Sequence, residues 1–344
     1  MALITKATKI AALIAVCVIT ALMPYLVDLF TLMQFTLYAS MSVLALALAF
    51  IWGFGGILSF GQTAFFGLGA YAYAIGVINF GDSTLAIPVA ILLPSIFAAL
   101  LGYFMFYGRV SDVYLGVITL TVSLILFNVV NSTSGDEYKI GTARIGGFNG
   151  IPSVPTFNAI GDPSYVLSPE QSWWFTGGCV IAIYLVLKLI LASTFGRIAV
   201  GVRENETRAA LLGYDPRLIK LGMFVLGGAI SGFAGCLFVN WGAFVSPAVF
   251  ALSLSAQTII WVVVGGLGTL VGPVIGCIFI QQLVAWVGTQ QTLNSYLALG
   301  IVLVGFVRLL PQGIAPTIER LLARIFRLKK AKPTETVVTN GRHA

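Results

Sequence analysis

Charged residues are scarce in this sequence, and their scarcity argues against a soluble protein. Only 9% of the 344 residues are Asp, Glu, Lys or Arg, whereas 58% are hydrophobic and the mean hydropathy is +0.99. Soluble domains carry about 25% charged residues. Several apolar runs reach the roughly 20 residues that a helix needs to cross a bilayer. The composition therefore predicts an all-α, polytopic membrane protein built as a bundle of transmembrane helices.

The residues and motifs of catalysis and metal binding are equally scarce. The sequence has one histidine, His343, and four cysteines that lie inside apolar runs without metal-like spacing: Cys17, Cys179, Cys236 and Cys277. It contains no P-loop, no H-E-x-x-H and no nucleophile elbow, so we expect no catalytic site, no metal and no cofactor of its own. No carboxylate or histidine stands convincingly in the middle of a span, which argues against a proton- or sodium-coupled carrier. A self-contained carrier or channel, or a receptor-like subunit, stays open as an alternative.

Hydrophobic runs and their breaks predict about ten spans. The third run and the pair divided at Gly272–Pro273 are short and rich in glycine, so broken or re-entrant helices are expected there. The ten spans lie near residues 10–27, 34–52, 63–79, 85–107, 113–131, 173–193, 218–240, 254–270, 272–288 and 293–310.

Basic residues set the predicted orientation. The net charge of +7 comes from clusters between spans and near the C-terminus, which indicate topology rather than nucleic-acid binding, because Lys and Arg favour cytoplasmic loops. With both termini in the cytoplasm, every basic cluster falls on that side. The predicted division is a transmembrane domain over residues 1–315, with a cytoplasmic loop at about 197–220 and an external loop at about 132–172, followed by a basic cytoplasmic tail over 316–344. The amphipathic start of this tail is expected to bind membrane lipid.

Glycine-rich interruptions occur in both halves of the chain. The first is Gly53–Tyr71, and the second comprises Gly227–Gly235 and Gly265–Pro273. Unwound backbone at membrane depth is tolerated where it lines a cavity or is buried in protein, so such breaks indicate a transport path. Close helix packing through small residues is the alternative. Candidate path residues are Ser59, Gln62, Thr63, Phe65, Asn128 and Gln257, and candidate structural glycines are Gly61, Gly67, Gly69, Gly265, Gly266 and Gly268.

A charged, helix-prone segment, Gly201–Pro216, stands between apolar spans. Its helix-forming residues run to Leu212, Gly213 suits the position after a helix, and Pro216 blocks continuation. Acidic residues come early and Arg208 later, as the helix dipole favours. A short helix with a small apolar face could dock into a groove on a soluble partner. An ordinary solvated connector is the alternative.

Several motifs in order give the chain a family resemblance. They are LSFGQTAFFGLGAY at 58–71, VYLGVITL at 113–120, GGFNGI at 146–151, FVLGGAISGFAGCLF at 224–238, FVSP at 244–247, VVVGGLGTLVGPVIG at 262–276 and VRLLPQGI at 307–314. Over residues 40–315 the chain resembles the branched-chain amino acid ABC transporter permeases of the LivM/LivH type, and it is most similar to the LivM branch.

The resemblance implies an importer subunit of the bacterial inner membrane that performs no chemistry itself. Its expected partners are a second homologous permease, two cytoplasmic ATP-binding subunits and a periplasmic solute-binding protein, with ATP bound by the partners. The charged segment corresponds to the family's coupling helix. The positions assigned to ATPase coupling are Arg203, Glu204, Asn205, Ala209, Ala210, Leu212 and Gly213. A branched-chain or other hydrophobic amino acid is the first expected solute, and urea or a short amide the second.

Overall fold

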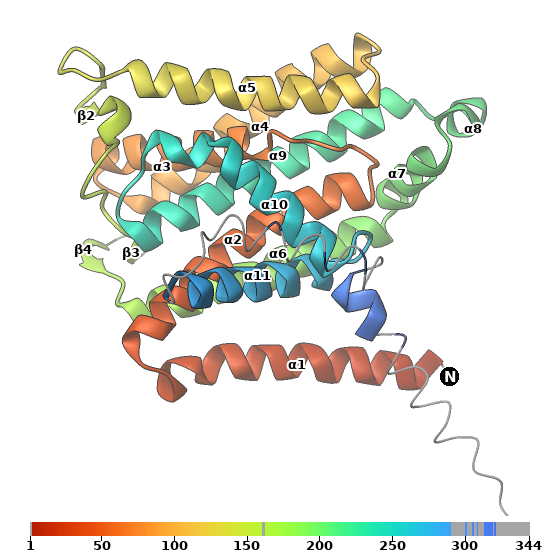
Figure 1. The fold of residues 1–344 in the computed structure, drawn as a ribbon, viewed down its shortest axis with the longest axis horizontal. Coiled ribbons are helices and arrows are strands. Elements are labelled where there is room, and N and C mark those ends of the chain that lie inside the picture. Colours follow the sequence, from red (N-terminus) through yellow and green to blue (C-terminus); the bar gives the residue numbers. More distant parts are fainter. Residues whose placement is uncertain are drawn as a thin grey trace, which may run out of the picture.

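A computed structural model describes residues 2–159 and 162–289, together with Gly300, Gly305, Arg308, residues 313–318 and Arg320. The described chain is a bundle of helices with two small β-hairpins at one end (Figure 1). The helices are α1 (Ala2–Leu26), α2 (Leu29–Gly53), α3 (Gln62–Phe80), α4 (Ser83–Tyr107), α5 (Asp112–Ser132), α6 (Pro169–Ala192), α7 (Thr194–Glu204), α8 (Glu206–Leu211), α9 (Pro216–Gly242), α10 (Leu252–Gly265) and α11 (Val271–Thr289), with 3₁₀ turns η1 (Gly147–Asn149) and η2 (Pro247–Phe250). The antiparallel hairpins pair β1 (Lys139–Ile140) with β2 (Ala143–Arg144) and β3 (Asn158–Ala159) with β4 (Asp162–Val166).

Within the described residues, seven helices are long and apolar enough to cross a membrane: α2, α3, α4, α5, α6, α9 and α11. The apolar part of α1, Leu13–Leu26, and α10 are shorter apolar helices. This confirms the prediction of an all-α, polytopic membrane bundle. The structure leaves the span count of ten unconfirmed, because the tenth predicted span, 293–310, and most of the basic tail lie outside the described residues.

Polar residues start several helices where the apolar runs begin. Asp28, Asp82 and Asp215 each accept a hydrogen bond from a backbone N–H in the first turn of α2, α4 and α9. Ser168 and Gln171 form a capping box at α6. These caps satisfy N–H groups that have no partner inside their own helix, and they place the charged residues at the ends of the bundle.

Of the two helix breaks predicted in the second half of the chain, one is confirmed and one is wrong. The break predicted at Gly265–Pro273 is confirmed, although it shortens the predicted span 254–270: α10 ends at Gly265, and Gly266 and Gly268 then adopt positive φ angles of 118° and 85°. The predicted interruption at Gly227–Gly235 does not exist, because α9 runs unbroken through it. Its glycines allow close helix packing instead. A glycine-rich apolar sequence by itself does not show whether its glycines pack helices together or break a helix.

The core is formed by α9 packed against α2, α3 and α4 (Figure 1). Backbone comes very close to backbone there: a Cβ at Gly69 of α3 would lie 2.1 Å from the carbonyl oxygen of Gly232 in α9. A Cβ at Gly235 would lie 2.0 Å from the carbonyl oxygen of Phe66. The small residues of the two helices therefore hold α3 and α9 in direct contact, as in many membrane helix pairs.

The bundle has two distinct ends. One carries α7 and α8, and the other carries the β-hairpins (Figure 1). We call them the α8 end and the hairpin end. The helix α2 finishes at the α8 end, where the Arg203 guanidinium donates to the Gly53 carbonyl, whereas α9 begins at that end and runs away from it.

Both α2 and α9 are followed by a largely buried return without α-helix, and then by a helix that starts inside the bundle. After α2, residues 54–61 lead to α3, and after α9, residues 243–251 lead to α10. The first return contains Gly56, which has a φ of 70°, and the N–H of the next residue, Ile57, donates to the Ile51 carbonyl at the end of α2. A glycine in this left-handed conformation commonly ends a helix. The two units run in opposite directions, which is the pattern of an inverted repeat with broken helices. The predicted break within Gly53–Tyr71 is thus confirmed.

Candidate functional site

The starts of α3 and α10 meet in the middle of the bundle. The hydroxyl of Thr63 in α3 lies 2.6 Å from the hydroxyl of Ser255 in α10. Thr63 also donates to the Ser123 hydroxyl of α5 at 3.3 Å, and the Phe60 N–H donates to the Thr119 hydroxyl at 3.2 Å. We call this group the central junction: Thr63, Thr119, Ser123 and Ser255, joined by Gln62 and Ser231 described next.

Gln62 ties the start of α3 to the centre of α9. Its side-chain amide donates to the Gly227 carbonyl at 3.0 Å and to the Ser231 hydroxyl at 2.6 Å. Only 2% of Gln62 is exposed, and Ser231 and Thr63 are fully buried. Uncharged groups thus satisfy one another at a depth where an unpaired polar group is costly.

Two oxygen atoms beside the central junction have no protein partner among the described residues. They are the Ser59 hydroxyl and the Gln62 carbonyl oxygen, and both are buried. Buried polar atoms are almost always hydrogen-bonded to protein or to ordered water. The junction therefore has two acceptor atoms without a protein partner among the described residues, one on the return before α3 and one on the first residue of α3.

The six residues predicted to line a path do not lie together. Ser59, Gln62 and Thr63 gather around the start of α3. Phe65 is a fully buried core residue whose ring lies 5.2 Å from the Phe224 ring in a T-shaped contact. The remaining two residues, Asn128 of α5 and Gln257 of α10, are exposed and half-buried, respectively.

The predicted structural glycines follow the broken helices. A Cβ at Gly61 would lie 1.8 Å from the Thr119 carbonyl oxygen, and one at Gly67 would lie 2.2 Å from the Phe250 ring. Gly69 contacts Gly232, as described above. A Cβ at Gly265 would lie 2.1 Å from the Gly272 carbonyl oxygen, which brings α10 against the start of α11. Gly266 and Gly268 supply the positive φ angles between these helices.

The predicted external loop folds as a cap over the hairpin end. The GGFNGI segment turns through three glycines with positive φ, Gly146, Gly147 and Gly150. It ends in an antiparallel bridge between Ile151 and Val245, and Val245 belongs to the return that precedes α10. The cap is therefore attached to the second broken helix unit.

Asp82 anchors the other hairpin of the cap. Its carboxylate accepts from the Asn158 side chain at 3.0 Å and from the Thr84 N–H at 2.8 Å. These hydrogen bonds, led by the one from Asn158, hold the pKa of Asp82 below its ordinary value. The side-chain oxygen Oδ1 of Asn158 in turn accepts from the Ser83 N–H at 2.8 Å.

The charged segment forms two helices rather than one. α7 ends at Glu204, and Asn205 caps α8 by accepting from the Arg208 N–H at 2.8 Å. Gly213, with a φ of 89°, ends the turn after α8, as the sequence predicts. The cap residue Asn205 thus sets the position of the bend between the helices.

All but one of the predicted coupling residues are exposed. The exception is Ala209, which is 6% exposed and packs within the chain, whereas Leu212 is 70% exposed. The other exposed members are Arg203, Glu204, Asn205, Ala210 and Gly213. Leu211, which was not predicted to take part, is 84% exposed. A groove of about 570 Å³ between α7 and α8 is lined by residues that include Arg197, Arg208 and Leu212.

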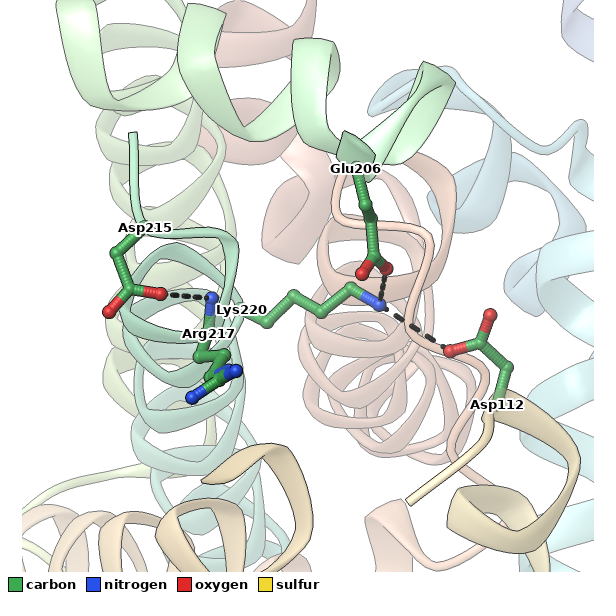
Figure 2. A network of polar contacts seen from close by, with 5 residues as sticks. All are labelled: Asp112, Glu206, Asp215, Arg217 and Lys220. Carbon is green, nitrogen blue, oxygen red and sulfur yellow. Dashed lines mark hydrogen bonds and ion pairs between the residues drawn. The ribbon is translucent and has the colours of Figure 1, made fainter. Parts of the chain in front are cut away.

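Lys220 is a functional candidate that the sequence analysis used only as a topology signal. Its ammonium group pairs with Glu206 of α8 and lies 3.4 Å from Asp112 at the start of α5 (Figure 2). The hydroxyl partners Ser123, Ser231 and Ser255 were also missed. Small hydroxyls are common inside membrane helices, so only their meeting in space distinguishes them.

These features define a class of protein: a multi-pass membrane protein with broken helices that meet at its centre. The chain belongs to the branched-chain amino acid transport system permease component family, whose family model matches residues 29–307. This is a family of transport permeases and not of enzymes.

Three relatives agree with this family. The chain is 30% identical over 332 residues to the high-affinity branched-chain amino acid transport system permease protein LivM of Escherichia coli (strain K12), covering 88% of this chain and 74% of the relative. It is 29% identical to the LivM protein of Salmonella typhimurium over the same shares. It is 24% identical to the probable LivM protein of Methanocaldococcus jannaschii, over 85% of this chain and 90% of the relative. No solved structure gives a significant match.

Proposed function

We propose that this chain is a permease subunit of an ABC importer that moves branched-chain or other hydrophobic amino acids across the inner membrane of a bacterium. The observation that carries the proposal is the family match over residues 29–307, supported by relatives named for branched-chain amino acid transport. The working assembly would contain a second homologous permease, two ATP-binding subunits in the cytoplasm and a periplasmic solute-binding protein. ATP would be bound by those partner subunits.

The α8 end is the proposed contact with the ATP-binding subunits. Leu211 and Leu212 form a solvent-exposed apolar surface. Arg197 and Arg208 lie along the groove between α7 and α8. An exposed apolar patch with a charged rim is typical of a protein interface. Closure of the ATP-binding subunits would displace α8, and the bundle would respond by opening to the other side.

The hairpin end is the proposed contact with the solute-binding protein, because it lies opposite α8 (Figure 1). A solute released there would meet the cap first and the central junction further in. The junction offers hydroxyl and amide groups and no ion pair, as suits a solute that passes without being held tightly.

Reconstitution tests the proposal. The chain is placed in liposomes together with the proposed second permease, ATP-binding and solute-binding subunits, and uptake of radiolabelled leucine is measured with and without ATP. We expect uptake that requires ATP and the solute-binding protein. Leucine uptake by this chain alone, without ATP, would instead establish a self-contained carrier, and uptake of urea in place of leucine would overturn the proposed solute.

Two substitutions at α8 test its role in this assembly. Changing Leu211→Asp and Leu212→Asp places charge on the apolar surface, so we expect at least a tenfold loss of ATP-driven uptake through loss of the ATPase contact. Because both side chains are exposed, the thermal midpoint of the permease should stay unchanged. Co-purification with the ATP-binding subunits measures the contact directly, and normal co-purification with normal uptake would contradict it.

A further inference from the structure

Lys220 joins three elements at the α8 end. It lies in the second turn of α9, and its side chain is only 13% exposed. The ammonium group pairs with Glu206 in the first turn of α8 and, at 3.4 Å, with Asp112 at the first position of α5 (Figure 2). The two carboxylates come from elements more than ninety positions apart in the chain, and the same ammonium holds both.

No other basic side chain in the described part of this corner is recorded as pairing with these carboxylates. The nearby Arg217 points elsewhere, with its guanidinium 5.9 Å from the centre of the Tyr107 ring. Asp215 accepts from the backbone N–H of Arg217 and caps α9. Among the described residues, the recorded ion pairs of Asp112 and Glu206 both go to Lys220. Without its charge, two carboxylates would face each other and repel.

The helix that begins at Asp112 reaches the central junction. α5 is a single helix from Asp112 to Ser132, and Thr119 and Ser123 lie in its middle. Thr119 accepts from the Phe60 N–H, and Ser123 accepts from the Thr63 hydroxyl. A helix moves as a rigid element, so displacement of its first turn shifts the residues further along it.

We propose that Lys220 is a positioning residue that transmits displacement of α8 to α5 and so to the central junction. The proposal rests on the proposed function, in which ATP-binding subunits move α8. Lys220 is suited to the task because its own helix, α9, is packed in the core while its side chain extends to the two outer elements. The link is in series, since breaking either the Glu206 arm or the Asp112 arm disconnects α8 from α5.

The test compares ATP hydrolysis with leucine uptake in the reconstituted complex. For Lys220→Met we expect hydrolysis within about twofold of wild type and uptake per ATP at least tenfold lower. Lys220→Arg keeps both ion pairs and should restore uptake. Glu206→Gln and Asp112→Asn should each give the loss of uptake seen with Lys220→Met. The double variant that combines Glu206→Gln with Asp112→Asn should lose no more uptake than either single variant, because the two arms act in series. Arg217→Met, three positions away, is the matched control and should transport normally.

A second measurement does not depend on a transported solute. Spin labels on Thr207 of α8, away from the proposed ATPase contact, and on Val113 of α5 report the distance between the two elements, since both side chains are exposed. In wild type the distribution of distances between the labels should stay narrow when ATP binds, since both elements move together. In Lys220→Met this distribution should broaden or shift. Identical distances in the two proteins, or an unchanged ratio of uptake to hydrolysis, would overturn the role of Lys220. Absence of ATP-driven leucine uptake in wild type would overturn the proposed function instead, and the label distances would still decide on Lys220.

Discussion

Gly69 shows how much of this bundle depends on a single missing side chain. A methyl group at this position would meet the Gly232 backbone oxygen at 2.1 Å, and neither backbone can yield without moving α3 or α9. We expect Gly69→Ala to lower the thermal midpoint sharply and to reduce the free energy of unfolding by roughly 1–3 kcal/mol or more. Gly178→Ala in α6 is the matched control, because no atom lies within 4 Å of its Cβ position. A scanning unfolding assay in detergent compares them, and equal midpoints would contradict the close packing.

Gln62 gives the corresponding test for the central junction. Replacing it by Leu removes both donated hydrogen bonds and leaves the Ser231 hydroxyl without this partner. A buried group that loses its partner costs about 1–3 kcal/mol, so the thermal midpoint should fall. Thr121→Val on the exposed face of α5 removes a hydroxyl that bonds only within its own turn, and it should change stability little. If Gln62→Leu is as stable as Thr121→Val, the junction contributes nothing to the fold.

Among the elements, apolar length could be predicted from the sequence, but the path of the backbone through the core could not. The starts of α2, α4, α5, α6 and α9 lie within a few residues of the predicted spans, because a capping residue or a charged residue stands at each start. The predicted spans 218–240 and 254–270 left the return at 243–251 outside a helix, but nothing in its apolar sequence indicated that it turns inside the bundle. Conversely, GGAISGFAG looks like a break but is helical, because its glycines contact α3 and α4. Packing partners decide both cases.

The attachment of the cap to α4 has a predictable pH dependence. Hydrogen bonds to the Asp82 carboxylate lower its folded-state pKa, so its contribution is present above the unfolded pKa of about 3.9 and is lost as the pH falls through the folded value. We expect protection of the Asn158 and Ser83 amides to be constant from about pH 7 to pH 5 and to weaken below about pH 4. Hydrogen exchange, corrected for the intrinsic rate, measures it. In Asp82→Asn this dependence should disappear, and an unchanged dependence would assign it to another group.

The whole molecule contains two copies of one arrangement, a helix, a return and a second helix, and the copies run in opposite directions. A visible run of glycines in the sequence marks only the return of the first copy. Gln62 and Thr63 could be selected because they follow a visible run of glycines, whereas Ser255 and Ser231 are ordinary small residues of apolar helices. The junction exists only because α3 and α10 start at the same depth. Coupling residues followed the same rule: Gly213 was recognisable by its backbone role, but Lys220 depends on Asp112, which lies 108 positions earlier.

Asn128 tests how this chain fits into a larger assembly. It is exposed on α5, where its amide bonds to the Leu124 carbonyl of its own helix at 2.8 Å. An exposed amide is costly against lipid, so we expect this face of α5 to lie on the solute path beside the proposed second permease. Asn128→Trp should then reduce leucine uptake at least tenfold without changing the thermal midpoint of the chain. Leu100→Trp, at a position 67% exposed on α4, is the control and should transport normally. Equal uptake by the two variants would place the path elsewhere, because a tryptophan that fills no space shared with the solute cannot obstruct it.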